Sequence, residues 1–191
     1  RIIETPGGML NSIGLANVGL KAFIKDKLPP LTGHACAVIA NVAGSAPADY
    51  VEVVECLNEE SGIWGYEINL SCPNVSAGCM AFGSDPRMVE QLTSELRKYT
   101  KRPLIIKLTP NVTDIGAIAK GAEEGGADAV SCINTLIGMV IDVSRRRPVL
   151  PRGTGGLSGP AVRPVGVAAV YRVSRAVSIP VIGVGGIMGA D

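Results

Sequence analysis

Short runs of consecutive apolar residues alternate with longer amphipathic segments from residue 35 onward. In the runs, apolar residues follow one another directly instead of occupying every second position, which is typical of strands covered on both faces. The amphipathic segments have the spacing of helices, and Pro47 stands near the first turn of one of them. We predict strands over residues 37–42, 66–71, 104–108, 129–134 and 180–184, and helices over 47–57, 85–99, 113–125 and 162–177.

The regular alternation of strands and helices predicts an α/β fold with a parallel sheet and right-handed crossovers. A closed TIM (β/α)8 barrel usually needs roughly 250 residues, whereas this chain has 191. One domain is the natural count for that length. We therefore expect residues 1–191 to form a single domain and, if the fold is a barrel, an incomplete barrel segment.

Two segments do not follow this pattern. Residues 1–35 are irregular, and within them Thr5–Leu15 is rich in glycine, which indicates either a connecting turn or a loop that wraps closely around a ligand. A short helix is predicted near residues 18–27, before Pro29 and Pro30 end it. Residues 138–156 are expected to be an irregular excursion before the last helix.

Polar residues interrupt the predicted strands only near their carboxyl ends. A single Asn or Lys at a strand end is usually a satisfied polar group. Here, however, successive strands each have one, and the carboxyl ends of parallel strands meet at one edge, where α/β proteins place binding and catalytic groups. We predict a shared ligand site that contains Asn41, Asn69, Lys107 and Asn134, with Gly185 and Gly186 after the last strand.

Cys72 stands where the second predicted strand breaks, directly before Pro73. Proline can neither donate to a β-ladder nor let its predecessor become helical, so we expect this thiol at the start of a polar loop. A buried and inert thiol is the commoner role of cysteine, but the position favours a functional one. The cysteines inside predicted elements are expected to fill the core, and these are Cys36, Cys56 and Cys132.

Lys107 follows three apolar residues and is expected to have little water around it. Such a lysine could form a Schiff base with a substrate, or it could place a positive charge beside an anionic ligand. Asn69, Asn74, Asn134 and Thr135 can donate and accept hydrogen bonds at fixed angles, which suits a planar heterocycle with ring N–H and carbonyl groups.

Two glycine-rich stretches, residues 155–159 and 183–186, lie before a predicted helix and at the end of the last predicted strand. Glycine there lets backbone N–H groups approach a phosphate, and the amino end of a helix favours negative charge. Each stretch alone is weak evidence, because loops between strands and helices often contain glycine for turn geometry.

Composition and charge narrow the possible partners. The net charge is +1, the pI is about 7.8, and the single dense basic run is Arg145–Arg147, which argues against a nucleic-acid surface. Five cysteines without a C-x-x-C pair do not resemble a secreted disulfide framework, so a reducing, cytoplasmic compartment is expected. No apolar run approaches the ~20 residues of a membrane helix. We therefore expect a soluble protein whose ligands are small molecules.

Taken together, these motifs resemble the class 1 dihydroorotate dehydrogenases, and more narrowly their class 1B catalytic subunit. A cysteine at position 72 is similar to class 1, whereas the membrane-linked class 2 has serine there. The resemblance implies a TIM barrel of which this chain contains about strands 3 to 7. The matching stretches are Thr5–Leu15, Ile39–Gly44, Asn69–Val75, Lys107–Val112, Ile133–Thr135, Gly155–Pro160 and Gly183–Gly186.

The resemblance also implies a reaction, the oxidation of (S)-dihydroorotate to orotate in pyrimidine biosynthesis. Cys72 would be the general base that takes a proton from C5, while C6 passes hydride to FMN. A thiol with a reference pKa of ~8.5 needs only modest lowering for that role. By position, the substrate would be held by Asn11, Ser12, Ile13, Gly14, Leu15, Asn69, Asn74, Asn134 and Thr135. FMN would be held by Asn41, Asn69, Lys107, Ile133, Gly159, Gly185 and Gly186.

A class 1B resemblance implies further partners. These are a second subunit carrying FAD and a [2Fe-2S] cluster, NAD as the final acceptor, and a homodimeric core in a heterotetramer. No cysteine spacing in this chain suits the cluster, so it would come from the partner. Against the eight strands of the family, the first two and the last are missing, which indicates a piece of a longer protein or a chain that is inactive as it stands.

Three alternatives stay open. A related flavin enzyme of pyrimidine metabolism, such as dihydropyrimidine dehydrogenase, has a similar Asn-x-Ser-Cys-Pro stretch. A Schiff-base lyase would use Lys107 as its nucleophile. An inactive fragment would lack strands that cofactor binding requires, and would expose two long sheet edges.

Overall fold

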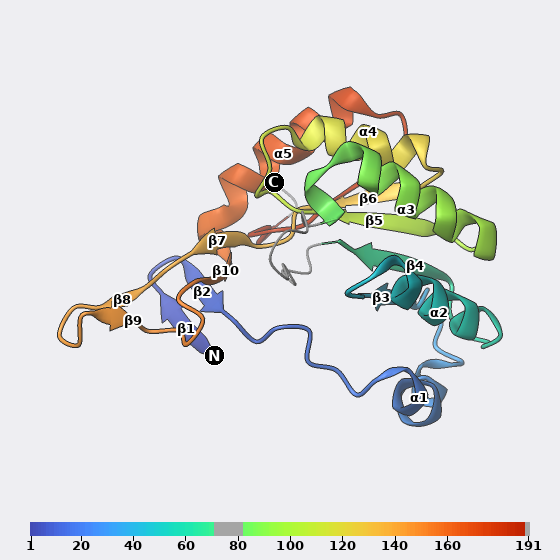
Figure 1. Ribbon diagram of the computed structural model, residues 1–191, viewed down its shortest axis with the longest axis horizontal. Coiled ribbons are helices and arrows are strands. Elements are labelled where there is room, and N and C mark those ends of the chain that lie inside the picture. The colour runs from blue at the N-terminus through green and yellow to red at the C-terminus, as the bar shows by residue number, and fades with distance from the viewer. Residues whose placement is uncertain (71–81, 190–191) are drawn as a thin grey trace.

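A five-stranded parallel sheet forms the centre of the computed structural model, which describes residues 1–70 and 82–189 (Figure 1). Each strand is hydrogen-bonded in parallel to its neighbours. The predicted α/β fold, an incomplete barrel segment, is thereby confirmed, and every predicted strand is present within two residues of its expected start. From one edge to the other the strands are β11 (Val181–Gly183), β6 (Ala129–Cys132), β5 (Leu104–Leu108), β4 (Gly65–Asn69) and β3 (Ile39–Val42).

Four helices cover one face of this sheet, and each packs against the next in chain order (Figure 1). Asp85 and Asp114 cap the second and third helices, because their carboxylates accept backbone N–H groups of the first turn. The helix predicted to start at residue 113 therefore starts two residues later, after its cap. The helices are α2 (Pro47–Asn58), α3 (Pro86–Tyr99), α4 (Ile115–Glu124) and α5 (Arg163–Ala176).

The hydrophobic core lies between the helices and the sheet. Alternate residues of each strand point to opposite faces, and those facing the helices are apolar and buried, as in Ile68, Ile106 and Val130. Helix α2 contributes Tyr50 and Val54 to the same cluster. The opposite face of the sheet, here called the inner face, carries the polar residues discussed below.

A second sheet, with four antiparallel strands, lies beside the first and was not predicted (Figure 1). Two of its strands lie in residues 1–35, and the other two lie at the two ends of the predicted excursion 138–156 and extend beyond it. Part of Thr5–Leu15 is therefore a hairpin strand instead of a loop, and most of the glycine-rich stretch 155–159 is also a strand. In order they are β1 (Ile2–Thr5), β2 (Gly8–Asn11), β10 (Gly155–Ser158) and β7 (Leu136–Gly138).

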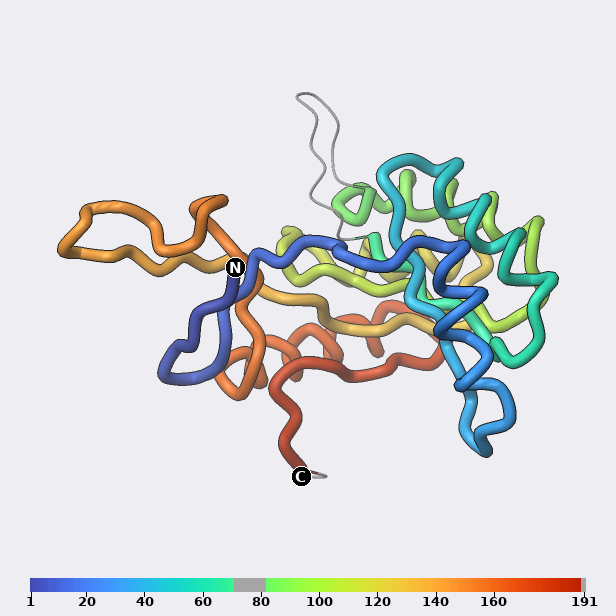
Figure 2. Tube along the Cα trace, turned by 90° about the horizontal axis from the view of Figure 1, so that it is seen from below, coloured from blue at the N-terminus to red at the C-terminus, as the bar shows by residue number. Residues whose placement is uncertain are grey.

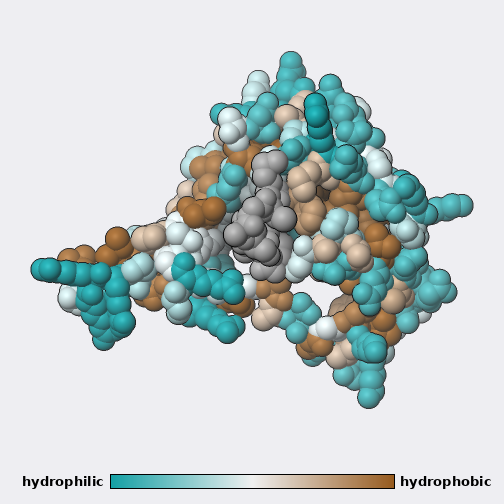
Figure 3. All heavy atoms as spheres, viewed as in Figure 1, coloured by the Kyte–Doolittle hydropathy of each residue, from teal (hydrophilic) through white to brown (hydrophobic). Residues whose placement is uncertain are grey.

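Between β7 and β10 the chain forms an arm that extends away from both sheets (Figures 1 and 2). The arm contains the short pair β8 (Ile141–Asp142) and β9 (Arg147–Pro148). Of the basic run, Arg145 and Arg146 lie in the turn between them, and Arg147 begins β9. Apolar side chains are exposed along it, among them Val143, and Figure 3 shows hydrophobic residues beside hydrophilic ones in this arm.

The helix predicted near residues 18–27 is present in a different form. It begins as the single-turn α1 (Leu20–Ala22) and continues as a π-helix, η1 (Phe23–Lys27), followed by the 3-10 turn η2 (Pro29–Leu31). Two further 3-10 turns, η3 (Phe82–Ser84) and η4 (Pro160–Val162), precede α3 and α5. Within residues 1–70 and 82–189, no helix is long and apolar enough to span a bilayer.

Three cysteines, Cys36, Cys56 and Cys132, were predicted to fill the core, and only one of these three does so. Cys132 is buried in the core, as expected. Cys36 and Cys56 are exposed, so the expectation that they fill the core was wrong. Cys56 lies on α2, whose buried positions are Tyr50, Val54 and Leu57, and the spacing of these residues turns Cys56 toward solvent.

Candidate functional site

The inner face of the sheet carries a polar cluster centred on Glu67 of β4. The Asn41 side-chain amide of β3 donates to Glu67 Oε1 at 2.6 Å, and the Ser131 hydroxyl of β6 donates to Glu67 Oε2 at 2.7 Å. Lys107 of β5 places its ammonium 3.4 Å from Glu67 Oε1 and 3.5 Å from Oε2. We call Asn41, Glu67, Lys107 and Ser131 the inner-face cluster, because four neighbouring strands each contribute one member.

Strand register explains why these side chains meet. Asn41 is paired with Glu67, and Lys107 is paired with both Asn69 and Ser131 on its two neighbours. Glu67 and Lys107 are only partly buried, with side-chain exposures of 21% and 17%. Two opposite charges in such a place attract each other more strongly than they would on an open surface, since water screens them less.

Glu67 and Ser131 belong to this cluster but were not among the predicted site residues, because the sequence analysis expected polar residues only near the carboxyl ends of the strands. A signal was present, because Glu67 precedes Asn69 by two residues in one strand and therefore shares its face. Ser131 lies in a strand whose residues are all buried, and a single serine there looks like core filler.

A second polar pair lies close to the carboxyl edge of the same face. The Asn134 side-chain amide donates to Asn69 Oδ1 at 3.1 Å, and the Thr135 backbone N–H donates to Asn134 Oδ1 at 2.8 Å. The Tyr50 hydroxyl donates to the Asn69 carbonyl at 3.0 Å, which fixes the end of β4 against α2. Three predicted substrate residues, Asn69, Asn134 and Thr135, are thus neighbours.

The antiparallel sheet brings Asn11 to this edge. Asn11 of β2 is paired with Gly156 of β10, and its side chain donates to the Gly156 carbonyl at 3.4 Å. Gly156 in turn lies against Thr135, because a Cβ at Gly156 would come within 2.2 Å of the Thr135 hydroxyl oxygen. The unpredicted sheet is therefore what places Asn11 next to Thr135.

The residues after Asn11 leave this sheet in an extended segment. Ser12 donates its backbone N–H to the Arg1 carbonyl, and Ile13 is exposed. Gly14 and Leu15 line a hollow of about 450 Å³ together with Asn41 at the edge strand β3. The predicted substrate stretch thus extends from the neighbourhood of Thr135 toward Asn41.

Three predicted cofactor residues, Gly159, Gly185 and Gly186, lie together beside the amino end of α5, and we call them the glycine junction. A fourth, Ile133, packs against it. A Cβ at Gly186 would lie 2.7 Å from both the Arg163 backbone nitrogen and the Gly159 carbonyl oxygen, and Gly186 has φ +69°. A Cβ at Gly185 would lie 3.3 Å from the Ile133 side chain. Glycine alone fits such contacts without strain. The backbone that follows β11, the residue before η4 and the first residue of α5 therefore meet closely at one point.

Cys72 and Asn74 lie outside the described residues, so their predicted roles remain predictions. Leu70 and Gly83, which are described, lie close together. A Cβ at Gly83 would come 3.1 Å from the Leu70 carbonyl oxygen and 3.2 Å from the Leu70 Cβ. Gly83 therefore lies at the carboxyl end of β4, next to the residue that follows Asn69.

Cys132, by contrast, has the properties of an inert thiol. It faces the helices and is fully buried, and this burial raises the pKa of the thiol to about 12. At neutral pH the group is protonated and out of reach of a ligand.

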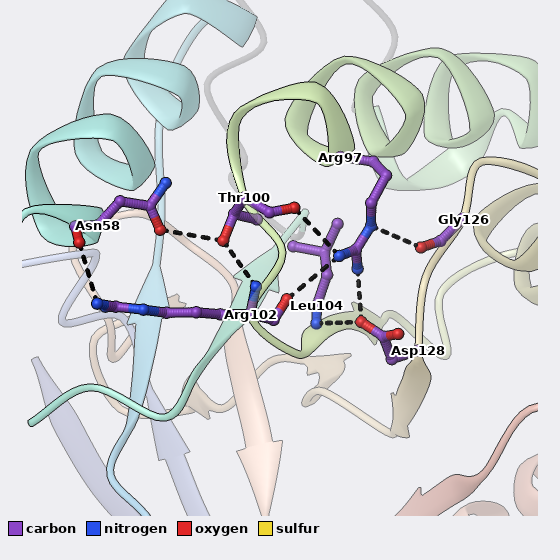
Figure 4. A network of polar contacts seen from close by, with 7 residues as sticks. All are labelled: Asn58, Arg97, Thr100, Arg102, Leu104, Gly126 and Asp128. Atoms are coloured by element: carbon purple, nitrogen blue, oxygen red, sulfur yellow. Dashed lines mark hydrogen bonds and ion pairs between the residues drawn. The ribbon is translucent and has the colours of Figure 1, made fainter.

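A different polar cluster lies at the amino ends of β4 and β5, away from the predicted site (Figure 4). The Arg102 guanidinium donates to the backbone carbonyls of Leu57, Asn58 and Glu60 at 2.9, 3.0 and 2.8 Å. Arg97 donates to the Gly126 and Thr100 carbonyls and pairs with Asp128. We call Asn58, Arg97, Thr100, Arg102 and Asp128 the amino-end cluster.

Comparison with known proteins places the site in a family context. The model of the family described as "Dihydroorotate dehydrogenase" matches residues 1–191. A relative from Citrifermentans bemidjiense is 53% identical over 98% of this chain, and one from Alkaliphilus oremlandii is 54% identical over 98%. Both are named "Dihydroorotate dehydrogenase B (NAD(+)), catalytic subunit". In each comparison the chain spans 62% of the relative's length.

A relative from Solibacter usitatus is 50% identical over 98% of this chain, which again spans 62% of the relative. Its name is that of a dihydroorotate dehydrogenase A with fumarate in place of NAD(+). Similarity at this level therefore extends to proteins whose names give different electron acceptors.

Proposed function

The chain belongs to the dihydroorotate dehydrogenase family, and we propose that the protein containing it oxidises dihydroorotate to orotate with bound FMN. The observation that carries this proposal is the gathering of amide, ammonium and hydroxyl groups from neighbouring strands on one sheet face. Asn41, Lys107, Asn69 and Asn134 all take part, and two of them contact each other directly.

The described residues fit FMN in two places. Asn41 and Lys107 offer N–H donors on the inner face, which suit the carbonyl oxygens and ring nitrogens of a flavin. At the glycine junction, Gly159, Gly185 and Gly186 are partly exposed beside the first turn of α5, and the amino end of a helix suits a phosphate. When bound, FMN would supply the acceptor for the hydride that leaves C6 of the substrate.

Residues of the carboxyl edge would hold the pyrimidine ring. The Asn69–Asn134 pair, Thr135 and Asn11 present donors and acceptors at fixed positions, which suits a planar ring with N–H and carbonyl groups. Ser12, Ile13, Gly14, Leu15 and Asn74 would complete this site. Cys72 follows Asn69 closely in the sequence and would take the proton from C5.

Lys107 would act through its charge. Its ammonium, held in place before the reaction, would stabilise negative charge on bound FMN without reorganisation. The strand holds Lys107 firmly, since β5 is paired on both sides.

A Cys72→Ala substitution in the full-length protein tests the proposal. The variant should retain FMN and bind orotate, yet lose turnover of dihydroorotate by roughly 10²–10⁴-fold, the usual value of a general base. Cys56→Ala is the matched control, because Cys56 is exposed on α2 away from the inner face, and its turnover should be unchanged. Wild-type turnover by Cys72→Ala would refute the base assignment.

The substrate class can be tested separately by ligand titration. Orotate should change the absorption spectrum of the bound flavin, and uracil should not. The reverse result would favour an enzyme like dihydropyrimidine dehydrogenase. Trapping of a substrate on Lys107 by borohydride, in a protein without flavin, would favour a Schiff-base lyase instead.

We also propose that the protein works in the cytoplasm with a second subunit carrying FAD and a [2Fe-2S] cluster, on a homodimeric core, with NAD as acceptor. The words "catalytic subunit" in the names of the relatives support a separate partner. Purification of the full-length protein with its partner should give NAD-dependent turnover. Turnover with fumarate, by the catalytic chain alone, would contradict the partner proposal.

A further inference from the structure

Glu67 is the charged centre of the inner-face cluster and has no role in the chemistry proposed above. We propose that Glu67 is a positioning residue that orients Lys107 and Asn41 and sets how much positive charge FMN experiences. This inference rests on the proposed function, because it requires FMN on the inner face.

The hydrogen bonds fix the orientation of the carboxylate. Asn41 donates to one oxygen at 2.6 Å and Ser131 donates to the other at 2.7 Å, from strands on different sides of Glu67. A carboxylate held at both oxygens cannot rotate freely, so it presents a fixed negative charge. The Asn41 amide is fixed by the same contact, because its nitrogen is directed at Glu67.

The distances to Lys107 are longer and almost equal, at 3.4 and 3.5 Å. The ammonium therefore lies opposite both carboxylate oxygens without a short bond to either. An ammonium has three N–H groups, and this geometry leaves it able to donate to a ligand. Glu67 thus offsets part of the positive charge of Lys107, and the Lys107 ammonium can still donate a hydrogen bond to the cofactor.

The electrostatic consequence has a definite sign. A reduced flavin carries more negative charge at its pyrimidine end than an oxidised one, so positive potential there favours reduction. The Glu67 carboxylate lowers that potential by opposing Lys107, and the two side chains are sufficiently buried for the effect to exceed that of a surface pair. Removing the carboxylate charge should raise the midpoint potential of bound FMN.

The test is the midpoint potential of FMN in the full-length protein carrying Glu67→Gln, which keeps the shape and removes the charge. We expect a rise of about 30 mV or more, which corresponds to a tenfold change in the ratio of reduced to oxidised two-electron couple. Ser131→Ala removes a hydrogen bond from the same carboxylate without removing its charge, so the potential should change less than in Glu67→Gln. An unchanged or lowered potential in Glu67→Gln would overturn the charge effect.

Two further variants separate positioning from general damage. Glu67→Asp keeps the charge but withdraws the carboxylate from Lys107 and Asn41, so FMN should bind at least tenfold more weakly, and the potential should rise less than in Glu67→Gln. Glu124→Gln removes an exposed carboxylate 3.9 Å from Lys120 and should change neither quantity. Wild-type FMN affinity in Glu67→Asp would overturn the positioning role.

The outcomes also distinguish this inference from the proposed function. If the wild-type protein binds no flavin, the proposed function is wrong, although the contacts of Glu67 with Asn41, Lys107 and Ser131 are unaffected by that result. If Glu67→Gln loses FMN while the apoprotein melts at the wild-type temperature, the loss supports positioning. If the apoprotein of Glu67→Gln melts at a much lower temperature, Glu67 is structural and the inference is wrong.

Discussion

The inner-face cluster and the amino-end cluster are both polar, and they differ in what their charged groups contact. Arg102 donates to three backbone carbonyls and thereby joins the end of α2 to the start of β5. In the inner-face cluster, Lys107 and Glu67 contact side chains from neighbouring strands and face away from the helices. Figure 4 shows how completely the amino-end side chains are directed at one another and at the backbone.

This difference distinguishes a structural role from a binding role. A guanidinium saturated by main-chain carbonyls has little left to offer a ligand, but it holds segments together. Side chains that meet at the carboxyl end of a parallel sheet can exchange their partners for a ligand. A cluster of polar residues is therefore not by itself a binding site. What distinguishes one is which groups the polar side chains contact, and where on the sheet they lie.

Neutralising one cation in each cluster tests whether the two clusters have different roles, and Lys107 should give the larger effect on catalysis. Lys107→Gln should lower kcat for dihydroorotate by roughly 10²–10³-fold, as expected when a preorganised electrostatic group is removed. The fold should be kept, since the strand pairings of β5 involve only its backbone. Steady-state kinetics on full-length protein checks this, and turnover near wild type would contradict the assignment of Lys107.

The corresponding change at the amino end is Arg102→Met. Three carbonyl groups and the Tyr66 hydroxyl would lose a donor, and each unsatisfied buried group costs about 1–3 kcal/mol. We expect the free energy of unfolding to fall by about 3 kcal/mol or more. Denaturant titration measures this. The kcat per folded molecule should be unchanged, and a large loss of kcat would erase the distinction between the clusters.

A smaller effect compares the two faces of one strand. Ser131 faces the inner cluster, whereas its neighbour Cys132 faces the helices, and burial raises the pKa of that thiol to about 12. In native protein at pH 8, alkylating reagents should modify exposed Cys36 and Cys56 but not Cys132, which should react after unfolding. Mass spectrometry of labelled peptides decides this, and rapid native labelling of Cys132 would refute its burial.

The same thiol predicts a pH dependence of stability. Burial raises the pKa of Cys132 in the folded protein, so as pH rises through about 9 the thiol of the unfolded chain loses its proton first. Stability from the neutral thiol is therefore present below pH 9 and declines as pH rises toward 12. Cys132→Ala should show a flatter decline over that range.

Much of the central sheet could be predicted from sequence because its strands are continuous apolar runs between helices. The antiparallel sheet could not, because its pairing is decided by partners far apart in the chain, such as Asn11 and Gly156. Glycine-rich stretches look like loops unless a distant partner strand is known. The orientation of Cys56 could have been predicted from the helical spacing of Tyr50, Val54 and Leu57.

The residues of the candidate site that lie at strand ends could be predicted from the sequence, whereas Glu67 at its centre was harder to recognise. Asn41, Lys107 and Asn134 stand out because a polar residue interrupts or ends an apolar run. Glu67 does not stand out when the strand is seen as a whole, but the two-residue spacing to Asn69 places both on one face. Which side chains contact each other depends on register, and register is fixed by the assembled sheet.

The most direct measurement is the absorption spectrum of the purified full-length protein during anaerobic titration with dihydroorotate. We expect a bound flavin whose oxidised absorption disappears on addition of dihydroorotate in the wild type, and persists in Cys72→Ala. A protein that binds no flavin, or a flavin that dihydroorotate leaves oxidised in the wild type, would refute the proposed reaction.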